Sequence, residues 1–157
     1  MPKTYGQKNC PVARTLDLFG DRWTLLLVRE LLLGKTRYQE FMAALPGVSP
    51  NLLSARLKTL EKEGLVRREQ YVEHPRRMEY RLTEEGKKVK FLIAVLIHWG
   101  SRHFGIKKTL VHEKCGKSID IQYHCPHCDT VVPETEVKVL AKGVGRKKKV
   151  GVFGKER

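Results

Sequence analysis

The chain has 157 residues, with 31 lysines and arginines against 17 acidic residues and a formal net charge of +14. This length suffices for one domain with a hydrophobic core plus an appendage, and the charge favours a polyanionic partner, nucleic acid first and an anionic membrane surface second. The longest apolar run, residues 91–97, is far below the roughly 18 residues of a spanning helix, and the N-terminus holds no apolar signal core. We therefore expect a cytoplasmic protein with reduced thiols and no membrane partner.

The first third of the chain predicts an arm and two helices. Residues 1–8 are expected to form a flexible arm. Asn9 could cap a helix over residues 10–19, which begins Cys-Pro and ends before a glycine. Asp21 is expected to cap a second helix over residues 22–33, whose high leucine content predicts that it is buried.

A helix-turn-helix pattern follows. Thr36 is expected to cap a helix over residues 37–45, after which Pro46-Gly47 makes a tight turn. The next helix has both ends marked, because Ser49 suits the N-cap and Gly64 suits a left-handed stop. Two helices joined by a short glycine-containing turn form the helix-turn-helix arrangement of DNA-binding proteins.

The second of these helices has a buried face and an outward face. Leu53, Leu57 and Leu60 recur at helical spacing and predict the buried stripe. The opposite face carries small, polar and basic side chains: Asn51, Ser54, Ala55, Lys58 and Lys62. Such a face suits the major groove, where amides and hydroxyls meet base edges and lysines meet phosphates, although an ordinary solvated helix has a similar composition.

A wing and a long helix are expected next. Strand-like residues 65–72 and 78–82 flank a turn whose tip carries Arg76 and Arg77, which suit DNA phosphates or solvent. Residues 83–104 then predict a helix whose middle is apolar nearly all round. Because a small winged domain covers only one side of such a helix, we expect a homodimer that presents two reading helices to a palindromic site.

Together these motifs resemble a known family. They are Asn9-Cys10-Pro11, Gly20-Asp21-Arg22-Trp23, Arg37-Tyr38-Gln39-Glu40-Phe41, Ser49 through Leu60, Glu63-Gly64-Leu65-Val66 and Glu79 through Gly86. In this order and spacing they resemble the HxlR-type transcription regulators of bacteria and archaea. The resemblance implies a mainly α, dimeric winged helix-turn-helix domain over residues 9–105, paired through its N-terminal helix and helix 83–104. It assigns DNA contact to Thr36, Arg37, Ser49, Asn51, Ser54, Lys58, Arg76 and Arg77.

Cys10 is a candidate redox sensor. Some relatives of this type sense oxidants through the cysteine of this N-terminal motif, and Cys10 occupies that position. A thiol at the start of a helix lies near the positive end of the helix dipole, which favours the reactive thiolate. The alternative is a small buried hydrophobic side chain without a sensing role.

The C-terminal segment has the spacing of a zinc site. His112 and Cys115 are separated by two residues, as are Cys125 and Cys128, and strand-like segments at 118–123, 130–132 and 136–139 surround them. Two such turns in hairpins are the plan of a zinc ribbon, and four N/S ligands would give a closed, structural zinc site. We therefore expect a zinc-ribbon-like extension over residues 106–141, with His124 or His127 as alternatives to His112.

Other functions stay open from the sequence. Cys125 and Cys128 also resemble the active-site pair of disulfide oxidoreductases, and in that case the winged domain would be a docking module. A third interpretation is a winged protein-interaction module without DNA affinity. No catalytic constellation is visible, so we do not expect an enzyme. Residues 142–157 predict a basic flexible tail that adds phosphate contacts or is simply solvated.

Overall fold

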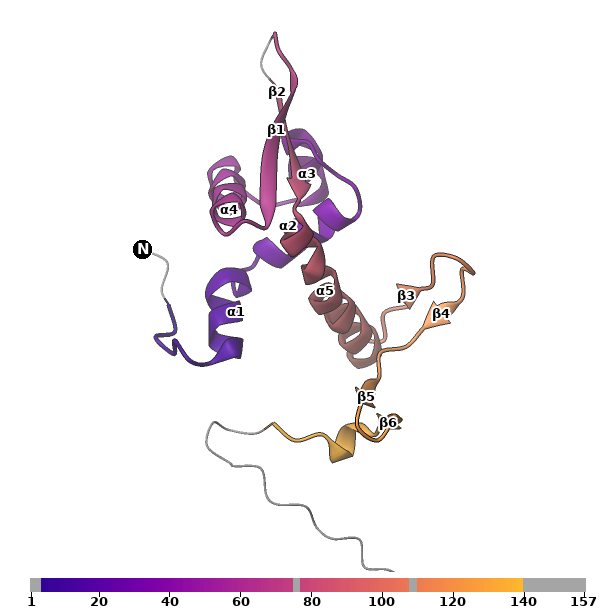
Figure 1. The fold of residues 1–157 in the computed structure, drawn as a ribbon. Coiled ribbons are helices and arrows are strands. Elements are labelled where there is room, and N and C mark those ends of the chain that lie inside the picture. The colour runs from indigo at the N-terminus through magenta and orange to yellow at the C-terminus, as the bar shows by residue number, and fades with distance from the viewer. Residues whose placement is uncertain (1–3, 75–76, 108–109, 140–157) are drawn as a thin grey trace, which may run out of the picture. The chain divides into compact units, whose positions relative to one another are not determined.

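A computed structural model describes residues 4–74, 77–107 and 110–139. By compactness the chain divides into a unit that ends at Ile119 and a second unit that begins at Asp120. The first unit contains helices α1 to α5, the β1–β2 hairpin and the β3–β4 hairpin, and the second contains the β5–β6 hairpin and a short 3-10 helix (Figure 1). The expected mainly helical winged architecture is therefore confirmed.

The first two helices begin later than the sequence predicts. Helix α1 spans Pro11–Phe19, and its N-cap is Cys10 rather than Asn9. Helix α2 spans Thr24–Leu32 and so begins two residues after the predicted start at position 22. Asp21 nevertheless serves this helix, because its carboxylate accepts hydrogen bonds from the amides of Trp23 at 2.8 Å and Thr24 at 3.0 Å.

The helix-turn-helix consists of α3, Tyr38–Ala44, and α4, Pro50–Lys62. The cap of α3 is Arg37, so the prediction of Thr36 was wrong by one residue. The shift places Glu40 at the third helical position, where its carboxylate accepts from the amides of Thr36 and Arg37, both at 2.8 Å. These two bonds lower the pKa of the Glu40 carboxyl below its usual value.

Helix α4 has the predicted ends. Ser49 Oγ accepts from the amide of Leu52 at 3.3 Å, and Pro50 occupies the first turn. Gly64 follows the helix at φ +71°, the left-handed conformation that favours glycine. The buried side of α4 presents Leu53, Leu57 and Leu60 to the core, each no more than 1 % exposed.

The wing is a hairpin of β1, Val66–Val72, and β2, Arg77–Leu82. Its register shifts between Gln70 and Val72, so Tyr71 lies in a bulge. At the base of the wing, Thr83 donates its amide to the Leu65 carbonyl at 3.0 Å and its hydroxyl to the Gly64 carbonyl at 2.6 Å. The wing is thereby fixed to the end of α4 and to the start of the next helix.

One hydrophobic core holds the first unit together. Its buried side chains come from α1, α2, α3, α4, β1 and the connection between α3 and α4: Phe19, Leu27, Val28, Leu31, Phe41, Leu45, Val48, Leu53, Leu57, Leu60 and Val66. Helix α4 is thus anchored along its whole inner face, which leaves its outer face rigidly presented.

Helix α5, Glu84–His103, projects from this core (Figure 1). Thr83 is its N-cap and accepts from the amide of Gly86 at 3.1 Å, so the helix expected over residues 83–104 begins one residue later and ends one residue earlier. Several large apolar side chains on α5 are exposed: Phe91, Val95, Leu96 and Trp99. No helix among the described residues is both long and apolar enough to cross a membrane.

The C-terminal part forms two small hairpins rather than one longer ribbon. Strands β3, Leu110–Val111, and β4, Ser118–Ile119, pair in the first unit, and β5, Tyr123–Cys125, pairs with β6, Thr130–Val132, in the second. The predicted strand over 118–123 is therefore split in two. The predicted strand over 136–139 was wrong, because η1, a 3-10 helix at Glu134–Glu136, follows Pro133 and residues 137–139 form no strand.

Candidate nucleic-acid interface

The outward face of α4 is presented as the periodicity predicts. Asn51, Ala55, Lys58 and Lys62 are exposed, directly opposite the buried leucines. Ser49 is also exposed at the cap, where one of its hydroxyl lone pairs is occupied by the Leu52 amide. A helix with amide, methyl and ammonium groups on one rigid, accessible face has the chemistry for major-groove contact.

Ser54 lies at the edge of this face and is hydrogen-bonded to α3. The Tyr38 hydroxyl donates to the Pro50 carbonyl at 2.8 Å, and the Ser54 hydroxyl donates to the Tyr38 oxygen at 3.3 Å. A carbonyl can only accept, so this chain of bonds has one direction. It connects the two helices of the helix-turn-helix and directs the Ser54 proton toward the protein.

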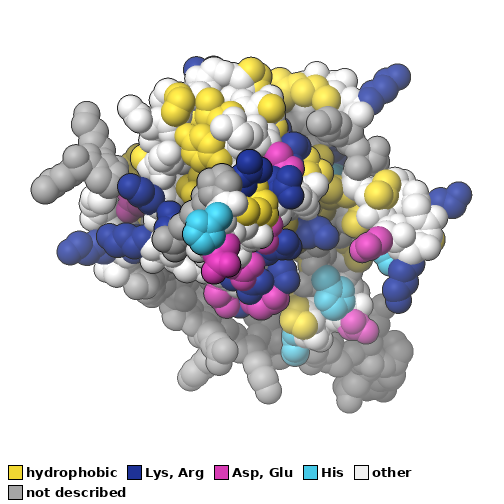
Figure 2. Space-filling view, turned by 90° about the horizontal axis from the view of Figure 1, so that it is seen from above, with side chains coloured by type: hydrophobic (Ala, Val, Ile, Leu, Met, Phe, Trp, Pro, Cys, Tyr) yellow, Lys and Arg dark blue, Asp and Glu magenta, His cyan; other side chains and the backbone are white. Residues whose placement is uncertain are grey.

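Two of the predicted DNA-contacting residues come together beside the wing. Arg37, at the start of α3, and Arg77, at the start of β2, line one recess of about 610 Å³. The Arg37 guanidinium lies 4.8 Å from the centre of the Tyr71 ring, so the bulge in β1 positions this cation. Figure 2 views this end of the molecule and shows Lys and Arg side chains beside carboxylates at its centre.

The remaining predicted contacts differ in placement. Thr36 is half-buried and lines a cavity at the base of the wing, where its carbonyl accepts from the Tyr80 amide at 2.7 Å. It therefore supports β2 rather than standing on the outward face of α4. Arg76 lies outside the described residues.

The two cysteine-containing turns have the same backbone geometry. The Gly116 amide donates to the His112 carbonyl at 2.7 Å, and the Asp129 amide donates to the Cys125 carbonyl at 2.9 Å. In each turn the residue whose amide donates also has a positive φ, +67° at Gly116 and +52° at Asp129. Each turn also joins two paired strands, so the chain builds one type of hairpin tip twice.

Each tip brings its two predicted ligands together. His112 Nδ1 lies 3.2 Å from Cys115 Sγ. In the other tip, the amides of Cys128 and His127 and the thiol of Cys128 donate to Cys125, which lowers the pKa of the Cys125 thiol and raises that of Cys128. His124 instead contacts Asp129 at 3.1 Å. Within the described part of the chain, no three or more His, Cys, Asp or Glu side chains are gathered closely enough to hold a metal ion.

Cys10 is half-buried at the N-cap of α1. It precedes Pro11, which removes one amide from the first turn of the helix. The sequence correctly places this thiol at a helix start.

Sequence reasoning missed three contributors to this region. They are the Tyr38 hydroxyl, the Tyr71 ring and the pair of Arg56 with Asp21, whose carboxylate lies 3.4 Å from Arg56 Nε. Each of them joins α3 or α4 to a neighbouring segment. Tyr38 carried a signal, because an aromatic residue with a hydroxyl stands at a helix start beside the turn. The other two depend on contacts between distant segments, which periodicity does not encode.

A capped recognition helix on a three-helix core, followed by a two-stranded wing, defines a winged helix-turn-helix DNA-binding protein. The family model described as HxlR-like helix-turn-helix matches residues 18–108. The chain belongs to this family of transcriptional regulators, which are not enzymes.

Relatives and solved structures agree with this assignment. An uncharacterized HTH-type transcriptional regulator of Mycobacterium bovis, Mb3122, is 40 % identical over 121 residues, which are 74 % of this chain and 76 % of the relative. The crystal structure of PA1607 is 30 % identical with a TM-score of 0.75 and covers 88 % of this chain and 99 % of its own. The redox regulator HypR in its oxidized form is 35 % identical with a TM-score of 0.56, covering 59 % of this chain and 96 % of its own.

Proposed function

We propose that this protein is a dimeric, sequence-specific transcription regulator that binds a palindromic site. Each α4 would enter a major groove, with the wings on the flanking DNA. The observation that carries this proposal is the exposed face of Asn51, Ala55 and Lys58, which lies opposite a fully buried leucine stripe. Arg37 and Arg77 add positive charge from two further elements beside the wing.

The experiment is selection of bound duplexes from a randomised pool, followed by binding measurements over a range of salt concentrations. We expect an inverted repeat whose half-site centres are about one helical turn of DNA apart. We also expect the logarithm of the affinity to fall linearly with the logarithm of the salt concentration, because phosphate contacts release counterions. Enrichment of no sequence would reject specific recognition, and absence of binding at low salt would favour a protein-interaction module.

We propose zinc as a structural cofactor held by His112, Cys115, Cys125 and Cys128. The donor set supports it, because two soft thiolate turns and one imidazole suit tetrahedral zinc. The repeated hairpin tip supports it further, since each tip already brings one pair of these donors together. Bound zinc would stabilise hairpins of two or three residues per strand, which are too short to form a core of their own.

Metal content and a native thiol count test the zinc proposal together. We expect about one zinc per chain, with Cys10 as the reactive thiol and the other thiols protected until a chelator is added. Cys115→Ser should remove the metal, and Cys10→Ser is the matched control that should retain it. His112→Ala should also lower the metal content; retention in that variant would move the fourth ligand to His124 or His127.

Cys10 is our candidate for oxidant sensing. The likeness to a redox regulator, 35 % identical over 59 % of this chain, favours it over an enzymatic dithiol. The Cys125–Cys128 segment connects two strands and opens no helix, which disfavours the oxidoreductase alternative. DNA affinity measured before and after mild peroxide treatment tests the proposal. The effect should vanish in Cys10→Ser and persist in Cys128→Ser.

A further inference from the structure

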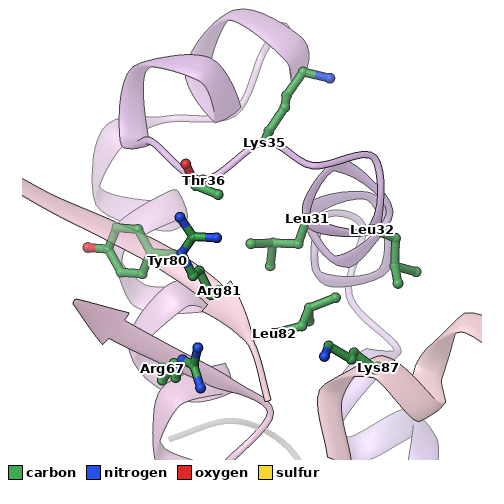
Figure 3. A pocket seen from close by; sticks show the side chains of 9 residues that line it. All are labelled: Leu31, Leu32, Lys35, Thr36, Arg67, Tyr80, Arg81, Leu82 and Lys87. Carbon is green, nitrogen blue, oxygen red and sulfur yellow. The ribbon is translucent and has the colours of Figure 1, made fainter. Parts of the chain in front are cut away.

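A second cavity, of about 280 Å³, lies at the base of the wing, where both strands meet α2 and the first turn of α5 (Figure 3). Leucine side chains and basic side chains make up most of its lining. The lining residues used below are Leu31, Leu82, Thr36, Arg67, Arg81 and Lys87. None of them stands on the outward face of α4.

Two like charges lie side by side in the lining of this cavity. Arg67 on β1 pairs directly with Arg81 on β2 in the register of the hairpin. Opposed like charges destabilise a two-stranded ribbon, so such a pair needs a counter-charge. Glu69 and Glu79 supply it: Glu69 lies 2.8 Å from Arg67 Nε and 3.5 Å from Arg81 Nε, and Glu79 accepts from Arg81 Nε at 2.8 Å.

These carboxylate contacts all use the Nε edge of the guanidinium. Figure 3 shows the terminal nitrogens of Arg81 directed toward Thr36, into the cavity. A guanidinium presents a fork of donors that matches a carboxylate, so the terminal nitrogens of Arg67 and Arg81 are suited to hold one.

A third cation comes from α5. The Lys87 ammonium lies 2.7 Å from Glu84, but both side chains of this pair are more than half exposed, at 59 % and 85 %. Exposed ion pairs contribute little, so Lys87 can change partner at small cost. Lys87 lines the cavity together with Arg67 and Arg81. Figure 3 shows its ammonium beside Leu82 and directed toward the wing strands, whereas Lys35 points away from them.

The leucine side chains and the size of the cavity restrict the ligand. Leu31 and Leu82 favour an apolar group in contact with them. An engineered cavity of about 150 Å³ is enough to hold benzene. A cavity of about 280 Å³ therefore has room for a ring and a carboxylate but is small for a nucleotide.

We propose that this cavity binds a small organic carboxylate with a flat apolar body. The carboxylate lies between Arg67, Arg81 and Lys87, and the body packs against Leu31 and Leu82. Because the cavity is bounded by α2, the wing and α5, an occupant fixes the base of the wing to both helices. The site does not depend on the proposed DNA-binding function, and its test uses the chain without DNA.

Calorimetric titration of the full chain with sodium benzoate, benzamide and inorganic phosphate tests the site. We expect benzoate to bind at least tenfold more tightly than the neutral benzamide and more tightly than phosphate, which lacks the apolar body. Arg81→Gln and Lys87→Met should each weaken benzoate binding at least fivefold. Arg68→Gln, the adjacent position on β1, and Lys88→Met, in the equivalent pair with Glu85, are the matched controls.

Several outcomes would overturn this proposal. Equal binding of benzoate and benzamide would remove the role of the cations, and unchanged affinity in Lys87→Met and Arg81→Gln would place the ligand elsewhere. Tighter binding of phosphate, or displacement of benzoate by duplex DNA, would make the cavity a contact for DNA phosphate. Thermal unfolding of each variant distinguishes loss of the site from loss of the fold.

Discussion

The Tyr38 hydroxyl restricts how Ser54 can bond to an outside partner such as DNA. Its single proton goes to the Pro50 carbonyl at 2.8 Å, so its oxygen can only accept from Ser54. The Ser54 proton is then directed at Tyr38, and the lone pairs of Ser54 remain for an outside partner. In the major groove, the donors that such lone pairs can meet are the amino groups of adenine and cytosine.

Tyr38→Phe removes this restriction. We expect a loss of about 0.5–1.5 kcal/mol in the free energy of unfolding for each hydrogen bond removed. We also expect weaker discrimination at the base pair nearest Ser54, because its hydroxyl becomes free to donate as well as accept. Urea unfolding and binding to single-base variants of the selected site measure the two effects. Tyr71→Phe is the matched control, and base preferences that stay the same in Tyr38→Phe would contradict the argument.

Substitutions at Asn51 and Lys58 should weaken DNA binding in different ways. Asn51→Ala should cost about 1–3 kcal/mol at one base pair and relax the preference there, since an amide can make a bidentate contact with a base edge. Lys58→Ala should weaken binding to all duplexes and reduce the salt slope by about one.

Fluorescence anisotropy on the selected site, its single-base variants and an unrelated duplex separates the two behaviours. Lys90→Ala, an exposed lysine on α5, is the control. An equal loss on every duplex for Asn51→Ala would remove its role as a base reader.

At the scale of elements, a buried carboxylate connects α2 to the helix-turn-helix. Glu30 is 4 % exposed; Arg29 Nη2 contacts it at 2.6 Å, and the Lys35 ammonium also contacts it from the loop that leads into α3. Burial raises the pKa of the Glu30 carboxyl, but hydrogen bonds and charge from Lys35 and Arg29 outweigh burial, and the pKa is lowered overall.

The sign of this shift predicts a pH dependence. A carboxyl with a lowered pKa in the folded state contributes stability above its unfolded pKa of about 4.3, and this contribution is lost as the pH falls through the folded pKa. Glu30→Gln should cost about 1–2 kcal/mol at pH 7, discounted because Arg29 and Lys35 are 37 % and 35 % exposed and can be rehydrated. The difference from the wild type should shrink below about pH 4.

Urea unfolding at pH 7, 5 and 3 measures this difference directly. Glu61→Gln, an exposed glutamate on α4, provides the comparison. A cost for Glu30→Gln that stays constant down to pH 3 would show that packing, rather than ionisation, makes Glu30 important.

Helices whose ends are marked by capping residues were predictable from the sequence, and contacts that depend on strand register were not. Ser49 and Gly64 mark α4 correctly because a cap and a left-handed stop involve only neighbouring residues. The strand expected over 136–139 did not form, since no strand among residues 4–74, 77–107 and 110–139 pairs with it. The Arg67–Arg81 pair and the place of Tyr71 depend on a bulge in the hairpin, which the alternation of residues does not reveal.

At the scale of the whole molecule, α5 exposes apolar side chains that no other part of the described chain covers. Phe91, Val95 and Trp99 recur at every fourth position and are 69 %, 36 % and 57 % exposed. On α1, Val12 and Leu16 are exposed at 67 % and 42 % with the same spacing. Monomeric proteins rarely expose such contiguous apolar surface, so these stripes support the proposed homodimer through the N-terminal helix and α5.

Trp99→Glu should therefore convert the protein to a monomer. A buried tryptophan contributes a large contact area, and a carboxylate at the same position would be desolvated against its own symmetry mate, so association should weaken by several orders of magnitude. Light scattering after size-exclusion chromatography measures the mass, and Lys90→Glu on the same helix should leave it at twice the chain mass.

Affinity for a full palindrome should fall in Trp99→Glu while affinity for a single half-site stays the same, because each α4 is anchored within its own chain. A monomeric wild type would refute the palindromic model, and a dimeric Trp99→Glu would move the interface to another surface.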